Sequence, residues 1–153
     1  MENKLHPIGT LGNIIPNIAT MLNRNVEQWS EKIVFQSKQD EKYQGISWKD
    51  LYNNILNISF NLKQYGFSAG DKMVIFSPNR LEMLELELAV MASGGIAVPI
   101  FAFFHKETAE LLINHSDAKY LAVAGDLQLR SVTDVHVKNI FVFKPIPGNQ
   151  KVS

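Results

Sequence analysis

The 153-residue sequence contains no cysteine, so disulfides, thiolate nucleophiles and thiolate metal sites are all excluded. It also lacks an excess of charge, because 15 Lys and Arg residues balance 15 Asp and Glu residues. A neutral chain has no overall field that would attract nucleic acid or an anionic membrane, and we expect neither partner. Hydrophobic residues make up 46% of the chain, which argues against disorder and favours a globular domain with a real core.

Long apolar runs are missing as well. No uninterrupted stretch reaches the ~18 apolar residues of a membrane span, and the N-terminus has no basic segment followed by an apolar run. We therefore expect a cytoplasmic protein with no membrane span.

The spacing of apolar residues predicts helices and strands that alternate along the chain. A helix over 14–29, with Pro16 in its first turn, precedes a β-hairpin of 32–38 and 42–46. Helices are expected at 47–65, 80–93, 106–115 and 126–132, and strands at 72–76, 96–100, 120–124 and 139–143. Such alternation implies right-handed crossovers. The predicted fold is therefore α/β: a mainly parallel sheet with helices on both faces, plus an N-terminal helix and β-hairpin.

Several residues predict where these helices begin and end. Ser47 and Asp50 resemble a capping box, and Gly66 stands where a left-handed C-terminal residue is wanted. Asn79, with Glu82 three residues later, is expected to start the helix over 80–93. That helix is apolar on nearly every side in its second half, so it should be buried from more than one direction.

The next strand, over 96–100, should be a buried one. Its Pro99 is expected at the end of the strand, where the lost N–H donor is tolerable.

Two glycine-containing segments invite a test for phosphate binding. Gly9–Gly12 is not preceded by a strand and lacks a following Lys, and Ser93–Gly95 precedes a strand where a phosphate loop would precede a helix. Helix termination and turn formation explain both segments better.

Metal and acid–base chemistry find little support. The four histidines are too scattered for a local metal motif: His6, His105, His115 and His136. Three carboxylates lie on different sides of the helix over 80–93 and cannot converge on one substrate: Glu82, Glu85 and Glu87. The helix dipole and solvent account for the first two of these.

Two segments at expected strand ends could take part in binding. Open α/β sheets bind ligands at the carboxyl ends of their strands, which is where Ser77–Arg80 lies, although capping by Asn79 and an ion pair of Arg80 would also explain it. The aromatic loop Phe101–Phe104 could line an acyl pocket or pack on the sheet. In a piece of a longer protein, this loop or part of the helix over 80–93 should be exposed and favour self-association.

Three spaced signatures, over 46–51, 70–80 and 92–100, together resemble the opening part of adenylate-forming acyl-CoA ligases. The residues that carry the likeness, which covers about 17–143, are Ser47, Trp48, Leu51, Gly66, Gly70, Asp71, Asn79, Arg80, Ala92, Gly94, Gly95, Val98 and Pro99. The Gly, the Gly-Asp turn and the Asn-Arg helix start are typical of the long-chain fatty-acid members. Such enzymes join a carboxylate to AMP, release pyrophosphate and pass the acyl group to coenzyme A.

The resemblance implies a division of the chain and a missing remainder. We expect 1–144 to be the N-terminal α/β subdomain and 145–153 a linker or tail that stops before the phosphate-binding loop. The family's phosphate loop, its magnesium-binding Glu, its ribose-binding Asp and its catalytic Lys have no match in this sequence. ATP, Mg²⁺ and CoA are therefore expected for a full-length parent, with the remainder of that ligase as partner, and the chain alone is expected to be inactive.

We assign no catalytic, cofactor-binding or metal-binding residue to this chain. The alternative is a stand-alone, flavodoxin-like binding module with a ligand site near Ser77–Arg80.

Overall fold

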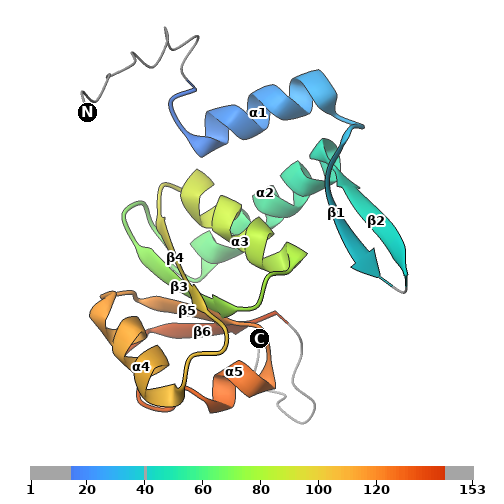
Figure 1. The fold of residues 1–153 in the computed structure, drawn as a ribbon. Helices are drawn as coiled ribbons and strands as arrows, with labels where there is room; N and C mark the ends of the chain where they lie inside the picture. Colours follow the sequence, from blue (N-terminus) through green and yellow to red (C-terminus); the bar gives the residue numbers. More distant parts are fainter. Residues whose placement is uncertain (1–14, 40, 144–153) are drawn as a thin grey trace, which may run out of the picture.

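The computed structural model describes residues 15–39 and 41–143, and within them the chain is α/β (Figure 1). A two-stranded antiparallel sheet stands apart from a parallel sheet with the strand order β4-β3-β5-β6. The strands are β1 (Ile33–Gln39), β2 (Lys42–Ser47), β3 (Lys72–Ser77), β4 (Ile96–Phe101), β5 (Tyr120–Val123) and β6 (Asn139–Val142). The helices are α1 (Ile18–Trp29), α2 (Trp48–Gln64), α3 (Leu81–Ala92), α4 (Lys106–His115) and α5 (Asp126–Arg130). The predicted fold class is confirmed.

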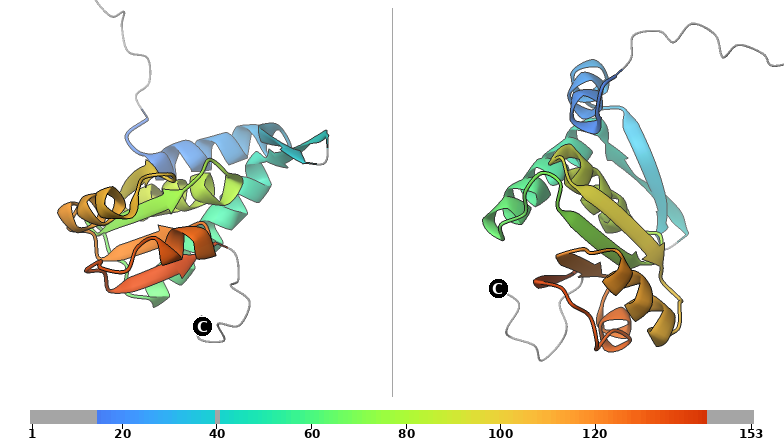
Figure 2. Two further views of the ribbon diagram at one scale, coloured as in Figure 1. Left: turned by 60° about the horizontal axis from the view of Figure 1, so that its bottom comes forward. Right: turned by 90° about the vertical axis from the view of Figure 1, so that its left-hand side faces the viewer.

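Helices cover both faces of the parallel sheet, as Figure 2 shows from two sides. On β3, Met73 and Ile75 belong to a core shared with α2 and α3, while Val74 and Phe76 belong to a core shared with α4. This alternation follows from the two-residue period of a strand, which sends successive side chains to opposite faces. All four side chains are at most 1% exposed, so β3 is the buried centre of the molecule.

Helix α3 is packed on two sides, as its all-round apolar sequence predicts. Leu86 and Val90 lie in the core with β3 and β5, while Leu88 and Ala89 lie in a second cluster with α1 and α2. Met91, 37% exposed, is the large apolar side chain that α3 leaves open to solvent among the described residues.

The predicted ends of α2 are confirmed. The Ser47 hydroxyl accepts a hydrogen bond from the Asp50 N–H at 3.1 Å and donates one to the Asp50 carboxylate at 2.7 Å. At the other end Gly66 has φ +84°, and the N–H of Phe67 returns to the carbonyl of Leu62 at 3.0 Å. This is the Schellman arrangement, which satisfies carbonyls that the helix end would otherwise leave unpaired.

The start of α1 differs from the prediction. Asn17 is the N-cap, with its side-chain oxygen accepting from the Thr20 N–H at 2.8 Å, and Pro16 precedes the helix. The expectation that Pro16 lies in the first turn is therefore wrong, because the stronger cap residue follows the proline directly. The expected first helical residue, at position 14, lies outside the described residues.

Pro99 corrects a second expectation. Strand β4 runs on to Phe101, so Pro99 lies inside the strand and does not end it. The expectation of a buried strand is wrong as well, because no residue of β4 is buried. A proline is tolerated there because β4 is at the edge of the sheet in the described residues, pairing with β3 alone.

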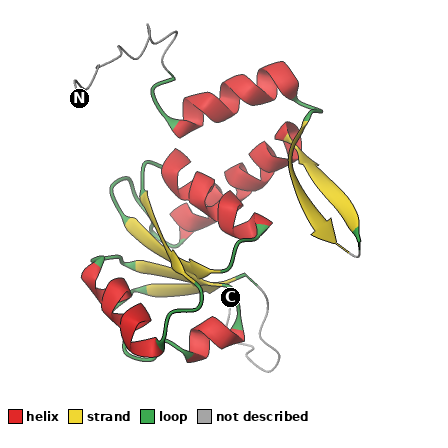
Figure 3. Ribbon diagram, in the orientation of Figure 1, coloured by secondary structure: helices red, strands yellow, loops and turns green. Residues whose placement is uncertain are grey.

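The hairpin of β1 and β2 lies beside α1 and α2 and away from the parallel sheet, as the colouring of Figure 3 makes plain.

Within 15–39 and 41–143, no helix has the length and apolar character that crossing a membrane requires.

Candidate functional site at the carboxyl end of the sheet

The carboxyl ends of β3 and β4 meet at one edge of the sheet, because the two strands are parallel and Ser77 is in register with Phe101. Ser77, the last residue of β3, is only 3% exposed, and its hydroxyl donates to the Pro78 carbonyl at 2.9 Å. The structure therefore brings together the two segments that the sequence offered as binding candidates.

A hollow of about 370 Å³ opens between these strand ends. It is lined by Ser77, Pro78, Asn79, Met83, Pro99, Ile100, Phe101, Ala102 and Phe103. The lining is mostly apolar, with Ser77 and Asn79 as its polar members, so it suits the apolar part of a ligand more than a phosphate.

The aromatic loop does not pack on the sheet. The Phe101 ring meets the rings of Phe103 and Phe104 edge to face, each at a centroid distance of 5.5 Å. These side chains remain 61%, 67% and 38% exposed, in that order. Of the two explanations that the sequence left open, packing on the sheet is wrong, while Phe101 and Phe103 do line a hollow.

Arg80 lies at the start of α3, where the sequence placed Asn79 as the cap. Arg80 is the N-cap and makes no side-chain capping bond, so the expectation for Asn79 is wrong. The predicted ion pair is confirmed: Arg80 Nε donates to Glu82 at 2.8 Å, and a second guanidinium nitrogen reaches the same carboxylate. The hydrogen bond to Glu82 raises the pKa of Arg80.

The same guanidinium lies 5.6 Å from the centre of the Phe143 ring, a cation–π contact. Glu82 balances the positive charge of Arg80, so this segment is not a ready anion site.

A second hollow, of about 350 Å³, separates the hairpin from α3. Its lining residues are Phe35, Gln36, Ser37, Gln44, Gly45, Ile46, Asn79, Arg80, Leu81 and Leu84. Asn79 borders both hollows, so the Ser77–Arg80 segment forms the wall between them. The sequence indicated this segment, but the hollow beside it depends on the hairpin, which is distant in the chain.

The sequence pattern of the family described as AMP-binding enzyme matches residues 22–150. The chain belongs to this family. The long-chain-fatty-acid–CoA ligase FadD15 of Mycobacterium bovis is 26% identical over 119 residues, 78% of this chain and 20% of that protein. The 4-hydroxybutyrate–CoA ligase 2 of Metallosphaera sedula is 34% identical over 117 residues, 74% of this chain and 20% of that protein. The chain thus spans about a fifth of the length of these curated relatives.

Solved structures agree on the fold. Klebsiella oxytoca NpsA in complex with 3-hydroxyanthranilyl-AMSN superposes with a TM-score of 0.75 at 15% identity, covering 85% of this chain and 25% of that one. A structure of the N-terminal subdomain of NpsA gives a TM-score of 0.73 at 15% identity, covering 82% of this chain and 30% of that one. The chain has the fold of an N-terminal subdomain of the adenylate-forming enzymes.

In this member of the AMP-binding enzyme family, the glycines that carry the family likeness have structural tasks. Gly94, with φ +77°, ends α3, as predicted. A Cβ atom on Gly95 would lie 2.4 Å from the Phe67 ring, so Gly95 allows a close approach of chain segments. The other glycine segment, Gly9–Gly12, lies outside the described residues.

Two glutamates of α3 have different partners, but the charge of Glu82 also helps to raise the pKa of Glu85, so the expectation that these two lie on different sides of the helix is wrong. Glu82 pairs with Arg80, whereas Glu85 is 7% exposed and accepts from the Asn54 side chain at 2.7 Å. Burial raises the pKa of Glu85, against the opposing effect of Asn54, and burial also raises the pKa of Glu87. The explanation of Glu85 by solvent and the helix dipole is wrong, since α2 covers it.

The described histidines belong to different segments: His105 precedes α4, His115 ends it, and His136 precedes β6, with its N–H donating to Asn114 beside His115 at 2.9 Å. In the described part of the chain, no three His, Asp or Glu side chains are grouped as they would be to hold a metal ion. His6 lies outside that part.

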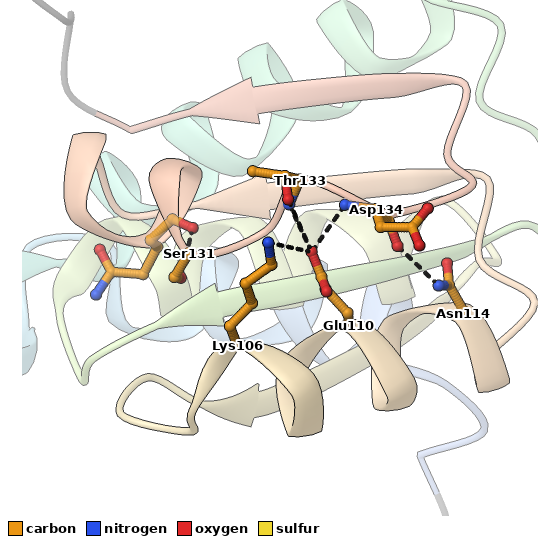
Figure 4. A network of polar contacts seen from close by, with 7 residues as sticks. Lys106, Glu110, Asn114, Ser131, Thr133 and Asp134 are labelled. Atoms are coloured by element: carbon orange, nitrogen blue, oxygen red, sulfur yellow. Dashed lines mark hydrogen bonds and ion pairs between the residues drawn. The ribbon is translucent and has the colours of Figure 1, made fainter.

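Away from the strand ends, Glu110 on α4 makes several polar contacts (Figure 4). One of its oxygens accepts from the N–H groups of Thr133 and Asp134, both at 2.7 Å, and lies 3.9 Å from Lys106 Nζ. One turn further along α4, Asn114 donates to the Asp134 carbonyl at 2.9 Å. These bonds satisfy backbone groups of the connection between α5 and β6, and so serve the fold. Sequence patterns give no sign of them because their partners are twenty or more residues away.

Proposed function

We propose that this chain is the N-terminal scaffold of an AMP-forming fatty acid–CoA ligase. The full reaction would convert ATP, a carboxylic acid and CoA to acyl-CoA, AMP and pyrophosphate. The observation that carries the proposal is the family match over 22–150, and the hollow between the carboxyl ends of β3 and β4 supports it. A long-chain fatty acid is favoured as substrate because the Gly70–Asp71 turn and the Asn79–Arg80 segment resemble those members of the family.

The remainder of the ligase is the partner in this proposal, and it would supply the sites for ATP, Mg²⁺ and CoA. Adenylation has to align a carboxylate, a triphosphate and a metal ion, and the rate enhancement depends on groups fixed around them. Among the described residues that line the two hollows, Arg80 is the one cation, and Glu82 already balances its charge. The chain alone therefore should not form an acyl adenylate, and we assign it no catalytic residue.

The first test is pyrophosphate release by the purified chain with ATP, Mg²⁺, CoA and either oleate or 4-hydroxybutyrate. We expect no release above that of a sample without protein. Turnover by the chain alone would contradict the view that the chemistry resides in the remainder.

A chimaera tests the scaffold role itself. The matching segment of FadD15 is replaced by residues 22–150 of this chain, and acyl-CoA formation is compared with that of FadD15 lacking the segment. Activity in the chimaera alone would support the proposal, whereas a folded but inactive chimaera would count against it. The stand-alone binding module with a site near Ser77–Arg80 stays a prediction, and the hollow beside Ser77 and Asn79 is the observation in its favour.

A further inference from the structure

The outer edge of β4 is an exposed, entirely apolar strand edge. Among the residues that the structure describes, β4 pairs with β3 and with no other strand. Its sequence, IAVPIF, contains no charged side chain, and Ile96 and Phe101 are 48% and 61% exposed. Such an edge is a template for pairing with another chain, and proteins normally protect it with charges, bulges or proline.

The hydrogen bonds show which backbone groups of β4 face outward. The N–H of Ile96 donates to the Asp71 carbonyl at 2.9 Å, so Ile96 turns its backbone toward β3. Because this direction alternates along a strand, Val98 and Ile100 also face β3, while Ala97, Pro99 and Phe101 face the free edge. Pro99 thus occupies the centre of the outward row.

The effect of Pro99 is clearest for two copies of β4 placed antiparallel about a two-fold axis. With the axis at position 99, Ala97 of one copy would exchange hydrogen bonds with Phe101 of the other, and the two residues at 99 would face each other. Proline has no N–H, so this central pair makes neither of its bonds, and each carbonyl oxygen faces the ring of the opposite proline.

We propose that Pro99 keeps the edge of β4 closed to a second copy of this chain. The proline is the protecting device because β4 has no charge to serve that purpose. Preventing this pairing explains why a proline, which lacks an N–H donor, lies in the middle of the strand. This inference concerns association and does not depend on the proposed function.

The test replaces Pro99 by valine, which suits a strand and restores the missing N–H. Mass is measured by light scattering at a concentration at which the unmodified chain is a monomer. We expect P99V to approach the mass of a dimer, and amide hydrogen exchange at Ala97 and Phe101 to slow at least tenfold. The matched control is P16V, which removes an exposed proline outside any strand and should leave the mass unchanged.

A second variant distinguishes pairing at the strand edge from unspecific aggregation of P99V. Adding F101K to P99V places a charge in the outward row and should return the monomer. A folded P99V with the mass of the unmodified chain would overturn the proposal. So would association that leaves the amides of β4 unprotected, or insolubility that F101K does not relieve, because the loss would then come from the fold and not from the edge.

Discussion

Gly94 and Gly95 are neighbours in the sequence, but they are glycines for different reasons. Gly94 adopts φ +77° at the end of α3, a backbone conformation that residues with a Cβ atom rarely adopt. Gly95 faces the ring of Phe67, which is 5% exposed and packs against Tyr120 at a centroid distance of 5.1 Å. The first role could be predicted from a helical pattern followed by glycine. The second depends on a residue nearly thirty positions earlier and has no local signal.

Substituting Gly95 by alanine should therefore destabilise the fold. The new methyl group would meet the Phe67 ring at 2.4 Å and the Asp71 carbonyl oxygen at 3.0 Å, so buried groups have to move. Overpacking of this kind costs about 1–3 kcal/mol in the free energy of unfolding, measurable by urea denaturation. Gly125→Ala is the control, since no atom lies within 4 Å and the backbone is extended there. Equal effects of the two changes would contradict the role given to Gly95.

At the scale of elements, local patterns were enough to predict the helices and strands, and where most of them begin and end. The bounds of α4 agree with the expected 106–115, and the cap of α2 by Ser47 was read from adjacent residues. Prediction failed where contacts with residues distant in the sequence determine the burial or the position of a residue. Glu85 is buried because Asn54 of α2 covers it, and Pro99 is tolerated because the strand order leaves β4 at the edge. At the candidate site, the strand end was predicted, but the hollow against the hairpin was not.

The hydrogen bonds that join Glu110 of α4 to the connection between α5 and β6 should be sensitive to acid. Hydrogen bonds from the N–H groups of Asp134 and Thr133 lower the pKa of Glu110. A carboxylate whose pKa is lower in the folded chain stabilises it above its ordinary range, about pH 4, and this contribution is lost as the pH falls through the folded value. Glu110→Gln should therefore lower the free energy of unfolding at pH 7 and change it less at pH 3.

Urea denaturation at both pH values measures this difference. Glu107→Gln, an exposed glutamate on the same helix, is the matched control and should show a smaller loss at pH 7. If Glu110→Gln lowers the free energy of unfolding equally at pH 7 and pH 3, the ionised carboxylate of Glu110 is not what stabilises the connection.

At the scale of the whole molecule, large apolar side chains remain exposed at the carboxyl end of the sheet. Phe101, the last residue of β4, and Phe103 in the loop that follows are 61% and 67% exposed, whereas α3 is largely covered. This matches one of the two outcomes expected for a chain that packs against further protein. Clustered exposed apolar groups favour association.

We therefore predict that the mass measured by light scattering rises with protein concentration, and that the double change Phe101→Ser and Phe103→Ser reduces the rise. Because both side chains are mostly exposed, the free energy of unfolding should change by less than about 1 kcal/mol. A chain that stays monomeric at high concentration, or a double variant that associates as the parent chain does, would contradict this role of the loop.

The alternation of side chains along β3 has a consequence for how the molecule comes apart. Met73 and Ile75 anchor one core, and Val74 and Phe76 anchor the other, on a single stretch of backbone. Neither layer of helices can lose its packing without withdrawing support from the strand that the other layer needs. The two halves should therefore melt together as one cooperative unit, with the amides of β3 among the last to exchange with solvent.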